Sequence, residues 1–66
     1  MDKTFLLTRD VMMGNGKIKT FSDSYKDENT ARIAYLIKDG RPVIHIRLSC
    51  INPDERTVTI LAEKSR

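Results

Sequence analysis

The alternation of apolar and polar residues in the last third of the chain constrains the fold more than any other feature. Apolar residues occupy every second position of a first run, as Ile44, Ile46, Leu48 and Cys50. A second run repeats the pattern, as Val58, Ile60 and Ala62. A period of two is typical of a strand that turns one face towards a core. Because the segment 52–55, Asn-Pro-Asp-Glu, has the composition of a turn, the two runs predict an antiparallel hairpin.

A second hairpin and one helix are predicted in the preceding part of the chain. Residues 4–11 are rich in β-branched and aromatic types, and the Gly-Asn-Gly turn at 14–16 leads into a second strand at 17–24. After Asp27 the apolar residues adopt helical spacing, until Gly40 and Pro42 end the pattern. The predicted stripe of this helix consists of Thr30, Ile33, Ala34 and Ile37, and Leu36 widens it. Either Asp27 or Asn29 can cap the start of the helix.

These elements predict a single small α+β domain over residues 1–66. Its order is β-β-α-β-β, and a four-stranded antiparallel sheet carries one amphipathic helix packed on one face. How the two hairpins meet in the sheet is left open by the pattern.

Composition and motifs argue against several classes of function. A lone Cys50 excludes an intramolecular disulfide and a cysteine-rich zinc site, and we expect it to be a small buried hydrophobe. No apolar run approaches the roughly 20 residues that span a bilayer, so we expect a cytoplasmic protein without membrane contact. His45 is the only histidine, and no catalytic, phosphate-binding or metal-binding motif accompanies it. We therefore expect a protein that is not an enzyme and needs no cofactor or metal.

The candidate partner-binding residues are basic side chains and two methionines. Twelve Lys and Arg against nine Asp and Glu leave a net charge of +3. Strand periodicity places Lys17 and Lys19 on one face of their strand, and His45 and Arg47 on one face of theirs. The two pairs predict a basic patch on the open side of the sheet. Arg9 joins it if that side chain also points outward. The candidates are Lys17, Lys19, Arg41, His45 and Arg47, with Met12 and Met13 as adaptable contacts beside the Gly-Asn-Gly turn.

Apolar residues are also expected on the open side. The core assignments above leave Val43, Ile51 and Leu61 facing away from the helix. Such a strip would favour a partner or self-association.

Four segments carry a resemblance to a known group of proteins. They are the opening strand 4–7 (Thr-Phe-Leu-Leu), the helix segment 30–34 (Thr-Ala-Arg-Ile-Ala), and the closing strands 43–46 (Val-Ile-His-Ile) and 58–61 (Val-Thr-Ile-Leu). Their layout resembles small phage-encoded anti-CRISPR proteins that are built from an antiparallel sheet and one helix. The resemblance implies a stand-alone inhibitor that occupies a surface of a CRISPR effector complex and meets protein or guide RNA through basic and polar side chains.

Three hypotheses follow, in decreasing order of preference. The first is a phage or mobile-element binding protein that inhibits or modulates a larger host protein or ribonucleoprotein complex. It would act through the open sheet face and the loop from Met12 to Lys17. The second is a small nucleic-acid-binding module that contacts phosphates weakly through its basic residues. The third is a homo-oligomeric accessory protein, for example a homodimer.

Overall fold

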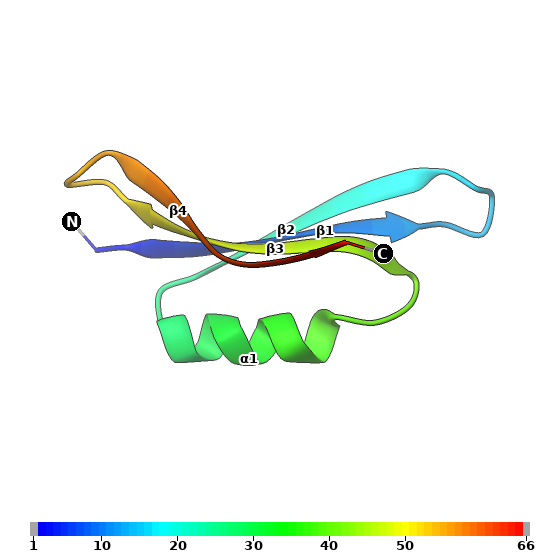
Figure 1. Ribbon diagram of the computed structural model, residues 1–66, viewed down its shortest axis with the longest axis horizontal. Helices are drawn as coiled ribbons and strands as arrows, with labels where there is room; N and C mark the ends of the chain where they lie inside the picture. Colours follow the sequence, from blue (N-terminus) through cyan, green and yellow to red (C-terminus); the bar gives the residue numbers. More distant parts are fainter. Residues whose placement is uncertain (1, 66) are drawn as a thin grey trace.

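The computed structural model describes residues 2–65 and contains one four-stranded antiparallel sheet and one helix. The strands are β1 (Thr4–Met12), β2 (Ile18–Tyr25), β3 (Val43–Asn52) and β4 (Thr57–Ser65), and helix α1 (Glu28–Lys38) follows β2 in the chain. Figure 1 shows α1 along one side of the sheet, while the tips of the two hairpins curve away from it. The α+β class, the element order and the antiparallel sheet are as predicted.

The strands lie in the order β2-β1-β3-β4, so the two hairpins meet through β1 and β3. Pairing of β1 with β2 is continuous, whereas two irregularities interrupt the other ladders. Ile44 is an extra residue of β3 opposite β1, and Leu61 is an extra residue of β4 opposite β3. Beyond a single extra residue, each side chain points to the face of the sheet opposite to the one that strict alternation predicts.

The core lies between the sheet and α1, and the two central strands supply most of it. Leu7, Ile46 and Leu48 are fully buried, and Leu7 and Leu48 are directly paired neighbours. The prediction that Ile46 and Leu48 point inward is therefore confirmed. Cys50 is half-buried at the margin of this core.

Helix α1 turns a different side to the sheet from the one predicted. Ala31 is fully buried, and Ala34 and Tyr35 pack against the core. The expected core residues Ile33, Leu36 and Ile37 are instead 57%, 73% and 76% exposed. The predicted stripe is therefore wrong, apart from Ala34.

Two features account for this orientation of the helix. Alanine side chains allow the helix backbone to approach a sheet closely, which larger aliphatic residues would prevent. An ion pair also holds the same side of the helix, because Lys38 Nζ lies 2.9 Å from Asp23 Oδ2 on β2. This hydrogen bond lowers the pKa of Asp23 and raises the pKa of Lys38.

The irregularities of the ladders overturn three further expectations. Val58 and Ile60 were expected to point inward, yet they are 67% and 52% exposed because the extra Leu61 reverses their direction. Leu61 itself packs against the core rather than on the open side. Val43 is buried for the corresponding reason in β3, where Ile44 is the extra residue.

Local hydrogen bonds form the helix start and the second hairpin turn as predicted. Asp27 Oδ2 accepts the backbone N–H of Thr30 at 2.9 Å, which caps α1 and lowers the pKa of Asp27. Asn52 Oδ1 accepts the backbone N–H groups of Asp54 and Glu55 at 3.1 and 3.2 Å. Within residues 2–65, none of the helices has the length and apolar character needed to cross a membrane.

Candidate binding surface

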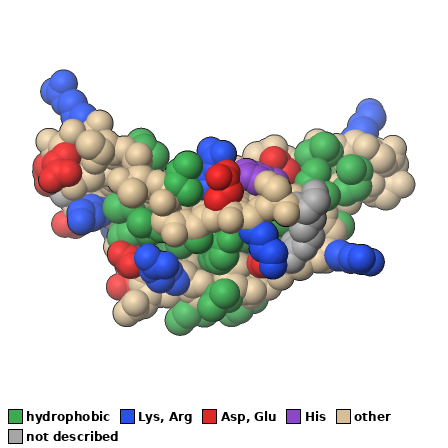
Figure 2. All heavy atoms as spheres, in the orientation of Figure 1, with side chains coloured by type: hydrophobic (Ala, Val, Ile, Leu, Met, Phe, Trp, Pro, Cys, Tyr) green, Lys and Arg blue, Asp and Glu red, His purple; other side chains and the backbone are tan. Residues whose placement is uncertain are grey.

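The side of the sheet opposite α1 is called the open face below. Register places on it the even-numbered residues of β1 and β2 and the odd-numbered residues of β3 from His45 to Ile51. Because the hairpin tips curve away from α1, this face is hollowed between two raised ends (Figures 1 and 2). The hollow makes it a candidate surface for a convex partner.

Five side chains from all four strands meet near the middle of the open face and form a charged cluster. The Thr20 hydroxyl donates to Asp10 Oδ1 at 2.7 Å, and His45 Nδ1 lies 3.6 Å from Asp10 Oδ2. On its other side, His45 Nε2 lies 2.9 Å from Glu63 Oε2, to which Arg47 Nε donates at 2.7 Å. His45 therefore lies between the carboxylates of β1 and β4, and all these side chains remain partly accessible to a partner.

The charged cluster is not basic. Asp10 and Glu63 contribute two negative charges and Arg47 one positive charge, which leaves −1 with neutral His45 and zero with protonated His45. The hydrogen bond from Arg47, followed by that from His45, lowers the pKa of Glu63. The two carboxylates thus neutralise the two basic residues that the sequence assigned to this face.

Exposed aliphatic side chains flank the charged cluster at both raised ends of the open face. Val58 and Ile60 lie at the β3–β4 end, next to Ile51, which is paired with Val58. Ile18 and Met12 are paired at the β1–β2 end and are 56% and 40% exposed. Figure 2 shows hydrophobic side chains on both sides of the central charged ones. We call these two groups the apolar ends.

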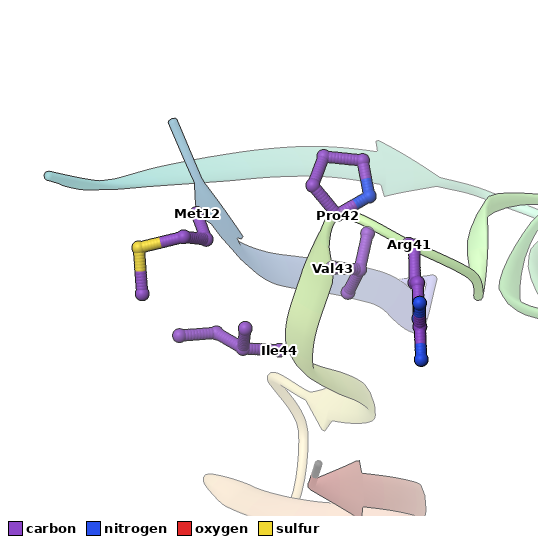
Figure 3. Close-up of a pocket in the computed structure, with 5 residues that line it drawn as sticks. All are labelled: Met12, Arg41, Pro42, Val43 and Ile44. Carbon is purple, nitrogen blue, oxygen red and sulfur yellow. The ribbon is translucent and has the colours of Figure 1, made fainter. Parts of the chain in front are cut away.

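A shallow pocket lies at the β1–β2 end and contains two of the predicted binding residues. It is lined by Met12, Arg41, Pro42, Val43 and Ile44 (Figure 3). The backbone N–H of Met12 donates to the carbonyl of Pro42 at 3.0 Å, which holds the two segments together. The flexible thioether of Met12 and the extra residue Ile44 give this pocket an adaptable apolar wall.

The other predicted binding residues do not join the open face. Lys19 is paired with Val11 and lies on the helix side, with its Nζ 5.2 Å from the centre of the Phe21 ring. Lys17 precedes β2 in the turn, where its N–H donates to Asn15 Oδ1 at 3.0 Å. The predicted patch of Lys17 and Lys19 beside His45 and Arg47 is therefore wrong.

Two remaining candidates lie outside this face as well. Met13 is exposed in the turn, where its backbone N–H donates to the Lys17 carbonyl at 2.8 Å. Arg9 points to the helix side, with its guanidinium 5.2 Å from the Phe21 ring centre and 3.8 Å from the Asp23 carboxylate. A role for Met13 in binding stays a prediction.

The arrangement offers hydrogen bonds and ion pairs to a partner rather than a metal site. Residues 2–65 contain no group of three or more His, Cys, Asp or Glu side chains placed to hold a metal ion. Both ring nitrogens of His45 face carboxylates, and Cys50 is paired with Phe5 on the helix side of the sheet. The accessible groups of the open face are therefore charged, hydrogen-bonding and aliphatic side chains.

Sequence reasoning missed the acidic half of the charged cluster and the apolar ends. Asp10 reaches His45 because β1 pairs with β3, a contact between the two hairpins that the sequence left open. Glu63 reaches His45 through the register of β4 on β3, which the sequence pattern did not give. Val58 and Ile60 were assigned to the core because no residue pattern marked Leu61 as the extra residue. Knowledge of the register would have found all four residues.

Comparison with known proteins found no relative for this chain. No family model matches it, and neither the curated proteins nor the solved structures contain a match. We therefore infer its function from the geometry of its surfaces.

Proposed function

We propose that the protein is a non-enzymatic binding protein that modulates a larger protein or ribonucleoprotein complex by covering part of its surface with the open face. The observation that carries the proposal is the hollowed open face, with a charged cluster between two apolar ends. Exposed apolar groups beside directed polar groups are characteristic of interfaces between proteins.

The charged cluster would supply the specificity of this contact. Arg47 and Glu63 are 44% and 37% exposed, so a partner can reach their free hydrogen-bonding positions without breaking the pair that they form. The planar guanidinium of Arg47 suits directed contacts with carboxylates or phosphates. Val58, Ile60 and Ile18 would supply the apolar area that is removed from water.

The class of partner follows from the resemblance of the layout to anti-CRISPR proteins. A CRISPR effector complex combines protein surfaces with exposed guide RNA, and a cluster that holds both signs of charge can contact either. The protein would inhibit such a complex by occupying a surface that the complex needs for its own activity.

Recognition of nucleic acid alone has less support. Arg47 and His45 are engaged by carboxylates, and Lys19 points to the opposite side of the sheet. Bases are usually read by stacking on aromatic side chains, whereas the aromatic residue Phe21 lies on the helix side. A protein component is therefore the better candidate for the main contact.

Binding to purified CRISPR effector complexes of several types tests the proposal, together with a plasmid-interference assay in bacteria. Ile60→Asp should weaken binding at least about tenfold, because it places a charge in an apolar contact. Thr59→Asp is the matched control, since Thr59 is also exposed but is paired with Cys50 on the other side of the strand. It should bind like the wild type.

Two results would reject the proposal in different ways. If no effector complex binds and interference is unchanged, the class of partner is wrong. If an effector complex binds and Thr59→Asp weakens binding while Ile60→Asp does not, the assignment of the open face is wrong.

A further inference from the structure

Unpaired basic side chains gather at one end of the sheet, where the β1–β2 hairpin extends beyond α1 (Figure 1). Lys17, Lys19 and Arg41 are exposed there, and none of them forms an ion pair with a carboxylate of residues 2–65. We call these three residues the basic end. We infer that the basic end binds the phosphate backbone of nucleic acid, on a surface separate from the open face.

The net charge of the molecule is concentrated at the basic end. The chain carries a net charge of +3, which equals the charge of the basic end alone. The opposite end of the sheet holds both signs of charge, because Asp2 and Lys3 lie there with Glu55 and Arg56. On the face shown in Figure 2, acidic side chains gather at the left end, whereas the outer part of the right end carries Lys and Arg without Asp or Glu. A polyanion is therefore attracted to one end of the molecule.

The carboxylates on neighbouring segments are engaged by other cations. Asp23 lies 2.9 Å from Lys38 Nζ and 3.8 Å from the guanidinium of Arg9, so this group of three carries one net positive charge. Asp39 lies 3.4 Å from a lysine Nζ of β4, and Asp10 belongs to the charged cluster on the open face. Lys38 also offsets the partial negative charge at the end of α1, because it lies in the last turn. None of these carboxylates neutralises the basic end.

The three cations of the basic end are close enough to contact one phosphate chain. Lys17 and Lys19 are two residues apart, which is about 7 Å along an extended chain. In the register of the sheet, Lys19, Val11 and Val43 form one row across three strands, so Lys19 lies about 10 Å from Val43. Arg41 precedes Val43 by two residues. Because each strand of a duplex carries a phosphate about every 3.4 Å along its axis, a single strand offers several phosphates over this span.

The ring of Phe21 holds Lys19 beside the sheet without neutralising its charge. Lys19 Nζ and the guanidinium of Arg9 each lie 5.2 Å from the centre of this ring. A cation–π contact positions an ammonium group but, unlike an ion pair, leaves its charge to act on an anion. The planar guanidinium of Arg41 suits a two-pronged contact with phosphate, and Figure 3 shows its side chain directed away from the apolar side chain of Met12. Lys19 and Arg41 are thus both available to a phosphate chain.

Nucleic acid fits the basic end better than a lipid surface does. A segment that enters a membrane interface presents apolar and basic side chains together, with the apolar ones foremost. Here the turn at the tip, residues 14–17, has the polar sequence Gly-Asn-Gly-Lys. The paired Met12 and Ile18 point to the open face, whereas Lys19 points to the helix side. The inference goes beyond the proposed function because it needs no effector complex and uses a different surface.

Fluorescence anisotropy with a labelled single-stranded RNA of about 20 nucleotides and mixed sequence tests the inference. Three phosphate contacts predict a dissociation constant on the order of 10–100 μM at about 50 mM salt. They also predict a loss of affinity of about 20-fold between about 50 mM and about 200 mM salt. Because phosphate contacts carry no sequence information, a second RNA of different sequence should bind equally well.

Two double variants with the same net charge locate the binding surface. Lys19→Glu with Arg41→Glu should weaken RNA binding at least about tenfold. Lys3→Glu with Lys26→Glu is the matched control, because it reverses two exposed cations that lie away from the basic end. Its affinity should stay within about threefold of the wild type at about 0.1 M salt, since charges are screened over about 10 Å and the molecule is 41 Å long. Melting temperatures show that both double variants remain folded.

Three results would overturn the inference. One is the absence of RNA binding up to a protein concentration of about 1 mM, well above the expected dissociation constant. Another is equal weakening by the two double variants, which would show that net charge alone attracts RNA. The third is tighter binding of phosphatidylserine vesicles or polyglutamate than of RNA, which would assign the basic end to a lipid surface or an acidic protein. Ile60→Asp should leave RNA binding unchanged, so failure of this inference can be told from failure of the proposed function.

Discussion

Two isoleucines of opposite burial provide a sharp test of how the helix and sheet are packed. Ile46 is fully buried in the central strand β3, whereas Ile37 is 76% exposed on α1. The sequence pattern assigned both to the core. Truncation of each to alanine removes the same atoms, so any difference in the free energy of unfolding reports burial.

The structure predicts a large difference between the two variants. Ile46→Ala should cost about 2–5 kcal/mol, which is the range for deeply buried aliphatic truncations. The total stability expected for a chain of this size is only about 3–10 kcal/mol. Ile37→Ala should change stability by less than about 0.5 kcal/mol, and the higher helix propensity of alanine favours a small gain.

Thermal and urea unfolding followed by circular dichroism measure both values. Each kcal/mol should shift the melting temperature by about 4–8 °C in a domain of this size. Equal destabilisation by Ile37→Ala and Ile46→Ala would refute the packing of α1 described above.

Three further changes have defined outcomes. Contacts with Arg47 and His45 lower the pKa of Glu63, so they stabilise the fold at pH values above the pKa of Glu63 in the unfolded chain. This stabilisation is lost as the pH falls through the pKa of Glu63 in the folded protein. Glu63→Gln should therefore make the free energy of unfolding depend less on pH in the acid range. Asp27→Ala should cost about 1 kcal/mol in urea unfolding, because it removes the helix cap. Arg56 has a positive φ of 54°, a conformation that glycine adopts more readily, so Arg56→Gly should raise the melting temperature. A variant with a lower melting temperature than the wild type would show that Arg56 is not strained.

The elements of the fold were predictable because local rules determine them. The cap at Asp27 and the turn side chain of Asn52 act within a few residues of chain, and the structure forms both as expected. Ile46 and Leu48 were correctly placed because no extra residue separates them within their strand. Each of these features depends on neighbours in sequence.

The surfaces were less predictable because they depend on long-range register and on a choice between two helix sides. One extra residue, Leu61, moved Val58 and Ile60 from the predicted core to the open face. In the helix, hydrophobicity favours the side of Ile37, but the sheet accepts the alanine side and the ion pair of Lys38 holds it there. Neither the extra residue in β4 nor the side of α1 that packs on the sheet can be predicted from neighbouring residues in the sequence.

The fold leaves a set of aliphatic side chains exposed to solvent, on the open face and on the outer side of α1. Isoleucine methyl NMR with a soluble paramagnetic agent tests this directly. In dilute protein, the methyl groups of Ile18, Ile33, Ile37 and Ile60 should relax strongly while those of Ile46 stay protected. Protection of Ile33, Ile37 and Ile60 equal to that of Ile46 in dilute protein would contradict the packing of α1 and the register of β4.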